Sequence, residues 1–374
     1  MIMKDVFSII NNTKEENKLG QIIKGRSLAT IPFGGRYRLI DFYLSNMVNS
    51  GIQNVGILVR KNYRSLLGHV RSPKEWDLDR KNDGIFILPP DNEDQHWGNL
   101  RGDLEVLNAN MDYIVRSKQK YVLITSSNII CNIDYTDAVK YHKANENDIT
   151  VIYNTLNSSI KDVLAYTQIK IDDKNKVTDM EMNSNKINGG KVSLESYVME
   201  KSLLMDIIYA CISRGEYDLV KDGIIRNLNK YKVHGYEFKG EVFNINSVQS
   251  YYNYSMKLLD NKVWNELFFN PNPIYTKMKD LAPVKYGECS NVKNSLIANG
   301  CVIDGEVKNS IIFRNVRIEK GVKIKDSIIM QNTIIDKNSI LENVIIDKDC
   351  FISKGNKFKG SQSYPTVIEK NTTI

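Results

Sequence analysis

The first residues that could take part in chemistry follow an apolar run, residues 6–10, which is typical of a β-strand. This run leads into a polar stretch, NNTKEENKLG, that contains no glycine before Gly20. Nucleotide-binding α/β proteins usually place glycines here, because backbone N–H groups must approach phosphate closely. Side chains obstruct that approach, and Glu15 and Glu16 add negative charge to it. The stretch therefore indicates either a phosphate-binding loop without its glycines or an ordinary polar turn.

The residues that most often act as metal ligands or nucleophiles are scattered along the chain. They are His69, His96, His142, His234, Cys131, Cys211, Cys289, Cys301 and Cys350. The cysteines are odd in number and form no CxxC pair, so the sequence predicts neither a disulfide framework nor a zinc site. No histidine has metal-ligand spacing. We expect structural roles for these residues and no metal bound by them.

Composition and charge narrow the function further. The chain has 374 residues, 42% of them hydrophobic and 25% charged, which predicts a globular protein of two to three domains. It has no apolar stretch of about 18 residues and no signal-peptide pattern, so we predict a cytoplasmic protein that does not bind membranes. The net charge is +7, but the lysines alternate with acidic residues and form no nucleic-acid-binding pattern. A phosphorylated metabolite fits this charge better than a nucleic acid does.

The first 250 residues alternate strand-like and helix-like patterns, which predicts an α/β domain with a mainly parallel sheet. The expected strands are residues 6–10, 54–59, 84–88, 121–125 and 148–153, with a hairpin at 165–182. The expected helices are residues 37–49, 102–116, 135–145, 202–215, 219–231 and 251–259. We divide the chain into an α/β domain at 1–255, a proline-containing linker at 256–288 and a third segment at 289–374.

The third segment repeats an aliphatic residue at every sixth position. The repeat consists of Val316, Val322, Ile328, Ile334, Ile340, Ile346 and Ile352. Six residues per face is typical of a left-handed parallel β-helix, whose coils bury a column of aliphatic side chains. An antiparallel domain with period-two strands is the alternative, but simple alternation would not keep this phase. Leu296 and Val302 are out of phase by two residues, which predicts a short insertion around residues 304–309.

Several long motifs resemble the glucose-1-phosphate adenylyltransferases, also called ADP-glucose pyrophosphorylases. They include PFGGRYRLIDFYLSNMVNSGI, EWDLDRKNDGIFILPP, YVLITSSNIICNIDY and PIYTKMKDLAPVKYGECSNVKNSLIANGCVIDGEVKNSIIFR. The resemblance implies a Rossmann-like nucleotidyltransferase domain followed by a left-handed β-helix. It also implies a tetramer, regulated by glycolytic phosphates, that makes ADP-glucose and pyrophosphate from ATP and glucose 1-phosphate with Mg²⁺.

The nucleotide-binding residues of that family are replaced here. Its glycine-rich GGxGxRL loop falls on Thr13, Lys14, Glu15, Glu16, Asn17, Lys18 and Leu19. Lys18 keeps the positive charge of the family's arginine, but the glycines are absent. The lysine that follows this loop in the family is replaced by Leu28. The resemblance therefore answers the opening question in favour of a phosphate loop that has lost its glycines.

The metal and sugar positions are replaced as well. The two metal-associated aspartates of the family correspond to Asn128 and Asn244, which supply none of the charge that draws Mg²⁺ out of water. The lysine that grips the sugar phosphate corresponds to Asn183, and a glycine of the small-residue turn SMGIY corresponds to Glu195. Each such loss would cost about two to three powers of ten in rate. We therefore expect no catalytic residues on this chain and no cofactor, with Mg²⁺ held by a catalytic partner.

This combination of an intact scaffold and a degraded site resembles the GlgD-type regulatory subunits of that family. The resemblance implies hetero-oligomerisation with a catalytic ADP-glucose pyrophosphorylase subunit in bacterial glycogen biosynthesis, although a homo-oligomer stays open. Two other hypotheses also stay open. One is an active nucleotidyltransferase with a remodelled site, and the other is a sugar-phosphate sensor that needs no partner.

Four basic residues lie near positions that bind regulatory phosphates in that family: Lys24, Arg26, Arg36 and Arg38. The resemblance makes them candidates for binding a sugar-phosphate effector, with Arg26 and Arg38 as the first choices. The alternative is that they are solvated or lie between subunits.

Overall fold

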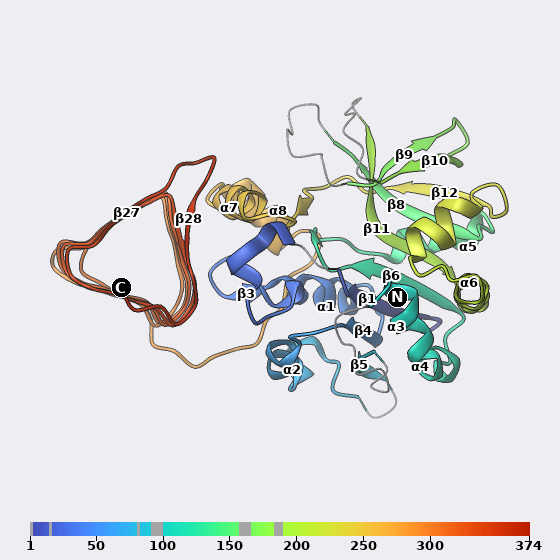
Figure 1. The fold of residues 1–374 in the computed structure, drawn as a ribbon, viewed down its shortest axis with the longest axis horizontal. Helices are drawn as coiled ribbons and strands as arrows, with labels where there is room; N and C mark the ends of the chain where they lie inside the picture. Colours follow the sequence, from blue (N-terminus) through green and yellow to red (C-terminus); the bar gives the residue numbers. More distant parts are fainter. Residues whose placement is uncertain (1–2, 15–16, 81–82, 91–99, 157–165, 183–189) are drawn as a thin grey trace.

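The computed structural model describes residues 3–14, 17–80, 83–90, 100–156, 166–182 and 190–374. Glu15, Glu16, Asn183 and His96, which the sequence analysis considered, lie outside these ranges. Figure 1 shows an α/β half built on one large sheet and a second half of stacked triangular coils, with helices α7 and α8 between them. The fold is thus an α/β nucleotidyltransferase-like domain followed by a left-handed parallel β-helix, as predicted.

The centre of the α/β half is a nine-stranded sheet in which β6, β1, β4 and β5 run parallel. Its strands are β1 Val6–Asn12, β4 Asn54–Val59, β5 Gly84–Leu88, β6 Tyr121–Ser126, β8 Ile149–Thr155, β9 Gln168–Ile171, β10 Val177–Glu181, β11 Lys191–Glu200 and β12 Val233–Glu237. The long strand β11 is antiparallel to both β6 and β8. The five predicted strands and the predicted hairpin are confirmed, and the sheet is mixed because β11 and the hairpin enter it antiparallel.

Helices cover both faces of the sheet (Figure 1). One face packs against α1 Leu39–Asn49, α2 Arg64–Val70 and α5 Thr136–Ala144, and the other against α3 Asp103–Ala109, α4 Met111–Arg116 and α6 Lys201–Ser213. Successive side chains of a strand point to opposite faces of the sheet, which explains the two hydrophobic cores. Val6 and Ile10 of β1 face the core under α1, α2 and α5, and Phe7 and Ile9 face the core under α3, α4 and α6. Each position of the apolar run is therefore buried, as a central parallel strand requires.

Two helical predictions need correction. The helix expected at 102–116 is divided at Asn110 into α3 and α4. The segment expected as a helix at 219–231 forms a π-helix, Leu219–Ile224, and a 3₁₀ turn, Ile225–Asn227. Side chains compete for its first backbone N–H groups, since Asp103 accepts from the N–H of Leu219 and Asp222 accepts from those of Tyr217 and Asp218.

The second half contains three parallel sheets of five strands, which form the sides of the triangle in Figure 1. The first has β14 Lys285–Tyr286, β17 Val302–Ile303, β20 Arg317–Ile318, β23 Ile334–Ile335 and β26 Phe351–Ile352. The second has β15 Asn291–Lys293, β18 Glu306–Lys308, β21 Lys323–Lys325, β24 Ile340–Glu342 and β27 Lys357–Lys359. The third has β16 Leu296–Ile297, β19 Ile311–Ile312, β22 Ile328–Ile329, β25 Val344–Ile346 and β28 Thr366–Ile368.

The coils are shorter than a strict period of six implies. Ile318 pairs with Ile335 and Ile335 with Ile352, an advance of 17 residues per coil. The aliphatic phase therefore slips by one residue each turn, and two members of the predicted buried column are not buried. Ile334 is 39% exposed and Ile340 is half-buried, whereas the adjacent Ile335 and Leu341 fill the interior.

The predicted insertion near residues 304–309 is wrong, and the irregularity is a deletion. The corner between β17 and β18 has two residues, Asp304 and Gly305, where the next coil has four between β20 and β21. A Cβ atom on Gly305 would lie 2.7 Å from the carbonyl oxygen of Val322, so the shortened corner requires glycine. The pairing of Val302 with Arg317 accordingly advances only 15 residues.

A hydrophobic cluster joins the two halves. The first isoleucines of three doublets, Ile311, Ile328 and Ile345, point out of the coils into this cluster, while their successors point into the coil interior. Facing them are aromatic residues, among them Phe33 and Phe268. Phe268 ends α8 Asn261–Phe268, a helix within the expected linker that the sequence analysis missed, next to α7 Val248–Lys257.

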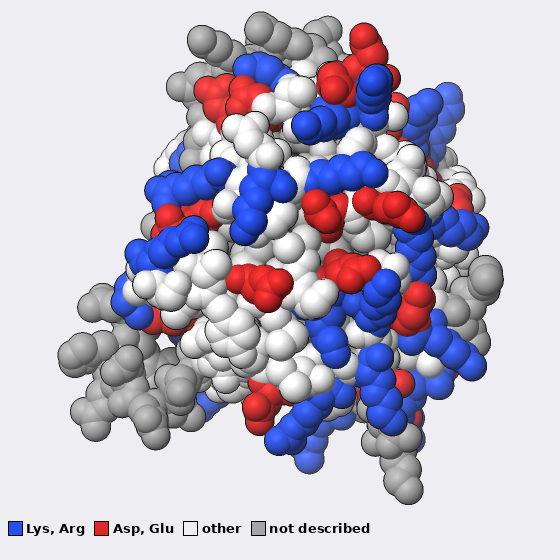
Figure 2. All heavy atoms as spheres, turned by 90° about the vertical axis from the view of Figure 1, so that its right-hand side faces the viewer, with Lys and Arg blue, Asp and Glu red and all other residues white. Residues whose placement is uncertain are grey.

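Short elements complete the α/β half and bring several site residues into place. They are β2 Pro32–Phe33, β3 Tyr37–Arg38, β7 Ile129–Ile130, β13 Phe243–Asn244, and the 3₁₀ turns Asn17–Ile23, Leu28–Thr30 and Pro73–Trp76. The described residues include no helix long and apolar enough to cross a bilayer. On the face shown in Figure 2, Lys and Arg side chains are interspersed with Asp and Glu rather than gathered in one patch.

Candidate functional site

The polar stretch after β1 lies at the carboxyl end of the parallel strands, where α/β proteins bind ligands. Thr13 is held against the end of the strand, because its hydroxyl donates a hydrogen bond to Asn11 Oδ1 at 2.7 Å. Lys14 follows, and its Nζ lies 2.5 and 2.6 Å from the two carboxylate oxygens of Glu195. Lys18 is exposed to solvent. The ammonium group of Lys14 is therefore already paired with a carboxylate of the same chain.

Glu195 reaches Lys14 because β11 bulges between Ser193 and Ser196. Glu195 has a φ of +50°, in the left-handed region that favours glycine. Its backbone N–H donates to the Ser193 hydroxyl, and its side chain is 9% exposed. The backbone thus keeps a conformation suited to the glycine expected from the family resemblance, while the residue present there places a carboxylate in the cleft.

Asn128 and Asn244 meet in the same region although 116 residues separate them. Asn128 lies between β6 and β7, Asn244 lies on β13, and β7 pairs with β13. The Asn128 Nδ2 donates to Asn244 Oδ1 at 3.0 Å, and the Ser126 hydroxyl donates to Asn128 Oδ1. Both asparagines are at most 3% exposed.

This pair does not fit a divalent metal ion. Mg²⁺ is held by carboxylate oxygens, and the amides here offer none and are bonded to one another. Among the described residues no group of three His, Cys, Asp or Glu side chains could hold a metal. A direct hydrogen bond therefore joins Asn128, just before β7, to Asn244 on β13, where the family resemblance implied a metal bridge.

Leu28 is a core residue, 4% exposed, in the 3₁₀ turn Leu28–Thr30. The adjacent backbone N–H of Ala29 donates to Asn12 Oδ1 at 3.1 Å, which ties this turn to the end of β1. A lysine at position 28 would need room and a counter-charge, and the surrounding cluster is apolar.

Asp103, at the start of α3, is a cleft residue that the sequence analysis did not consider. Its carboxylate accepts hydrogen bonds from Asn11 Nδ2 at 2.7 Å and from the N–H of Leu219 at 2.9 Å. Burial, with a smaller contribution from Asp218, raises its pKa to about 6. Spacing along the chain could not reveal it, because its partners are 92 and 116 residues away.

Two of the four predicted effector residues connect the α/β half to the β-helix. Arg26 Nη2 lies 2.5 Å from Asp347 Oδ2, and both side chains are at most 4% exposed. Lys24 Nζ lies 2.6 Å from Glu369 Oε2 at the surface. The guanidinium of Arg26 is thus committed to a buried ion pair between the two halves.

The other two predicted residues lie near the same junction. Arg36 is exposed and donates to the hydroxyl of Tyr37. Arg38 is partly buried, its Nη1 donates to the backbone carbonyl of Ser65 at 2.8 Å, and its backbone N–H donates to Asp41. Burial, followed by the charge of Arg26, lowers the pKa of Arg38, while Asp41 opposes that shift.

Three further cations belong to the same electrostatic environment: Lys279, Arg314 and Lys348. Burial lowers the pKa of Lys348 to about 8, with Arg26, Lys370 and Arg38 adding to the shift. Burial and the charges of Arg314 and Arg38 lower the pKa of Lys279, and burial with the charge of Arg36 lowers that of Arg314. We call Arg38, Lys279, Arg314 and Lys348 the junction cluster. Burial is the main cause of these lowered pKa values and neighbouring cations add to it, so a bound anion would favour the charged forms.

Comparisons with known proteins agree with this architecture. The family described as "Nucleotidyl transferase" matches residues 18–261, and the one described as "GlmU-like, C-terminal hexapeptide" matches residues 281–360. The chain is therefore a nucleotidyltransferase-fold protein with a hexapeptide-repeat β-helix.

The curated relatives define the family more closely. The chain is 39% identical to the glycogen biosynthesis protein GlgD of Bacillus subtilis over 99% of this chain and 97% of that protein. It is 39% identical to the GlgD of Geobacillus stearothermophilus over 98% and 96% of the two chains. The glucose-1-phosphate adenylyltransferase of Mycoplasma mobile is 31% identical over 87% and 86%. The chain belongs to the glucose-1-phosphate adenylyltransferase family.

Proposed function

We propose that this chain is a regulatory subunit with no adenylyltransferase activity of its own, which associates with a catalytic glucose-1-phosphate adenylyltransferase subunit in glycogen biosynthesis and changes its kinetics. The observation that carries the proposal is the hydrogen bond between Asn128 and Asn244 at 3.0 Å. Where the family resemblance expects two carboxylates and a metal, this chain has two neutral amides that bind one another. These two neutral amides do not offset the charge of a triphosphate.

The Lys14–Glu195 ion pair supports the same proposal. A lysine near the end of β1 could attract a phosphate, but its charge is offset by a carboxylate 2.5 Å away. An incoming triphosphate would have to break that pair and lie beside Glu195. The names of the two relatives at 39% identity, which describe glycogen biosynthesis rather than adenylyl transfer, point the same way.

The junction cluster suggests how regulation works. It lies where Arg26 and Asp347 join the two halves, so an anion bound there would contact both. We propose a sugar phosphate as the anion, and a coupling between subunits of about 1 to 3 kcal/mol. A tetrameric assembly and a cytoplasmic location remain predictions.

A mixing experiment tests the proposed function. The purified chain is assayed for pyrophosphate release from ATP, glucose 1-phosphate and Mg²⁺, alone and combined with a catalytic subunit of the family. We expect no turnover above background for the chain alone, co-elution with the catalytic subunit, and altered substrate or effector affinity in the mixture. Turnover by the chain alone would support the remodelled-enzyme alternative, and sugar-phosphate binding without any association would support the sensor.

A further inference from the structure

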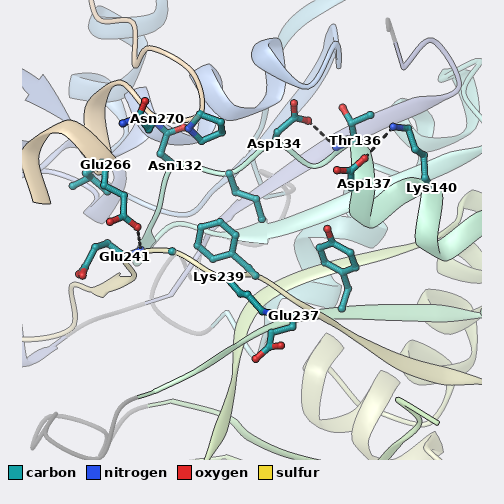
Figure 3. Close-up of a pocket in the computed structure, with 16 residues that line it drawn as sticks. Asn132, Asp134, Thr136, Asp137, Lys140, Glu237, Lys239, Glu241, Glu266 and Asn270 are labelled. Carbon is teal, nitrogen blue, oxygen red and sulfur yellow. Dashed lines mark hydrogen bonds and ion pairs between the residues drawn. The ribbon is translucent and has the colours of Figure 1, made fainter. Parts of the chain in front are cut away.

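We call the region of Lys14, Glu195, Asn128 and Asn244 the degraded cleft. A cavity of about 740 Å³ lies apart from it, between the start of α5, the end of β12 and the end of α8 (Figure 3). Pockets for small ligands usually have volumes of about 300 to 1,000 Å³. The cavity lies near the same β7–β13 pair as the cleft, since Asn132 follows Asn128 by four residues and Glu241 precedes Asn244 by three. None of the family-derived site positions that the structure describes lines it.

The cavity wall contains a buried acceptor without a donor. Asn132 is 5% exposed, and its Nδ2 donates to the carbonyl of Asn272 at 2.7 Å. Its Oδ1 has no hydrogen-bond partner among the described residues, although leaving a buried polar atom unpaired is unfavourable. Asn132 lines the cavity beside Asn270 (Figure 3). Because this oxygen is itself buried, a ligand hydroxyl would reach it only after the Asn132 side chain turned toward the cavity.

The charges of the cavity exclude the family's own anionic substrates. Its wall carries five carboxylates and two ammonium groups: Asp134, Asp137, Glu237, Glu241, Glu266, Lys140 and Lys239. Several are engaged already, since Lys140 pairs with Asp137 at 2.9 Å and Glu266 accepts from the backbone N–H of Glu241 at 2.8 Å. The carboxylate of Glu241 and the ammonium group of Lys239 have no ion-pair partner among the described residues, so an acceptor and a donor stay available to a ligand. A phosphate would be repelled, whereas a neutral ligand with many hydroxyls could use both groups.

Two aromatic residues form part of the remaining wall. Tyr236 and Phe238 line the cavity, and because they are two residues apart on extended chain their side chains point to the same side. Both are partly exposed and rest on the core of the α/β half. Aromatic faces beside carboxylate and amide groups suit a sugar, which presents C–H groups on its faces and hydroxyls around its rim.

We propose that this cavity binds the end of a neutral α-linked glucan chain, with its rings against Tyr236 and Phe238 and its hydroxyls bonded to Glu241 and Lys239. The choice of an α-linked glucan rests on membership of a family whose relatives serve glycogen biosynthesis. The site gives the chain contact with the polymer that the pathway extends, and it is separate from both the degraded cleft and the junction cluster.

The test is calorimetry on the full chain with four probes: maltotriose, cellotriose, spermidine and glucose 1-phosphate. We expect saturable binding of maltotriose, at least tenfold weaker binding of cellotriose, and none of the cation or the anion. Co-sedimentation of the protein with glycogen then shows whether it binds the ends of the polymer as well as the free oligosaccharide. Absence of maltotriose binding, equal binding of cellotriose, or preference for spermidine or glucose 1-phosphate would overturn the proposal.

Matched variants locate the site. Phe238→Ala and Glu241→Gln should each weaken maltotriose binding at least fivefold. Phe351→Ala and Glu306→Gln, which change an exposed phenylalanine and an exposed glutamate of the β-helix, should leave it unchanged. Because Phe238 also rests on the core, Glu241→Gln keeps the test decisive if Phe238→Ala fails to fold. Unchanged affinity in Glu241→Gln would place any observed sugar elsewhere and contradict the assignment.

Discussion

The degraded cleft and the junction cluster are both polar, but the polar groups of the first are paired with one another, whereas the second gathers groups of like charge. In the cleft, side chains bind one another: Lys14 binds Glu195, and Asn128 binds Asn244. At the junction, burial and then the neighbouring cations lower pKa values, as at Lys348. A region whose groups satisfy one another has little use for a charged ligand, whereas a region with excess positive charge gains by binding an anion. The comparison favours the junction over the cleft for the anion binding that we propose.

The largest expected effect comes from breaking the ion pair that holds the junction. Asp347→Asn keeps the shape of the side chain but leaves the buried Arg26 guanidinium without a counter-ion. We expect the free energy of unfolding, measured in urea, to fall by about 3 to 5 kcal/mol. The control is Lys24→Ala, which removes an exposed ion pair between the same halves and should cost less than about 1 kcal/mol. Equal losses in the two variants would show that burial of the Arg26 pair does not matter.

The second effect tests the hydrogen bond in the cleft. Asn244→Asp still accepts from Asn128, and Asn128→Asp can accept from Asn244 if that amide turns, because its Nδ2 has no partner among the described residues. The double variant sets two carboxylates about 3.0 Å apart. We expect it to be destabilised by about 1 to 3 kcal/mol beyond the sum of the single variants.

The control is the dependence of this destabilisation on pH and on Mg²⁺ in the same double variant. Repulsion raises the carboxylate pKa values in the folded state, so this penalty should grow as the pH rises above about 4 and shrink in acid. Mg²⁺ should reduce it at pH 7 if the two positions still face one another as metal ligands would. Additive effects of the two substitutions at every pH would contradict the geometry of the pair.

The third effect is the pH dependence of anion binding at the junction. Sulfate keeps its charge between pH 7 and 9, while Lys348, with a pKa of about 8, loses its proton over that range. We expect the sulfate dissociation constant, from calorimetry at low ionic strength, to rise about tenfold from pH 7 to 9. Lys348→Met should flatten that profile and weaken binding at pH 7, whereas Lys308→Met, at an exposed position of the β-helix, should change neither. A flat profile in the unsubstituted chain would remove Lys348 from the site.

The smallest effect concerns the backbone at Glu195. With φ at +50°, this position favours glycine over any residue with a Cβ atom. Both Glu195→Gly and Glu195→Ala remove the ion pair with Lys14, so their difference reports the backbone alone. We expect the glycine variant to be more stable than the alanine variant by about 1 kcal/mol in thermal or urea unfolding. An alanine variant of equal or greater stability would mean that the bulge relaxes.

The fold could be predicted from the sequence where local pattern determines it. Strands β4 and β5 have the predicted bounds, because short apolar runs mark both, although only β4 is buried throughout and Phe86 of the edge strand β5 is exposed. The β-helix was predicted from its repeat, but the one-residue slip per coil was not, since doublets such as Ile334 and Ile335 hide which member faces inward. Helix α8 was missed because prolines follow it and suggested a linker.

The site was less predictable because its contacts are long-range. Family resemblance, not spacing, singled out Asn128 and Asn244, and only the fold shows that they bind each other. The partner of Lys14 lies 181 residues away, and that of Arg26 lies 321 residues away. The additional cations Lys279 and Lys348 carry no local signal, because a cluster formed by two domains has no sequence periodicity.

The assay that tests the central claim most directly measures ADP-glucose formation with this chain alone, with a catalytic subunit alone, and with both. The account predicts background turnover for this chain, and a mixture whose substrate or effector dependence differs from that of the catalytic subunit alone. Ordinary enzymatic turnover by this chain, or a mixture kinetically identical to the catalytic subunit, would contradict it.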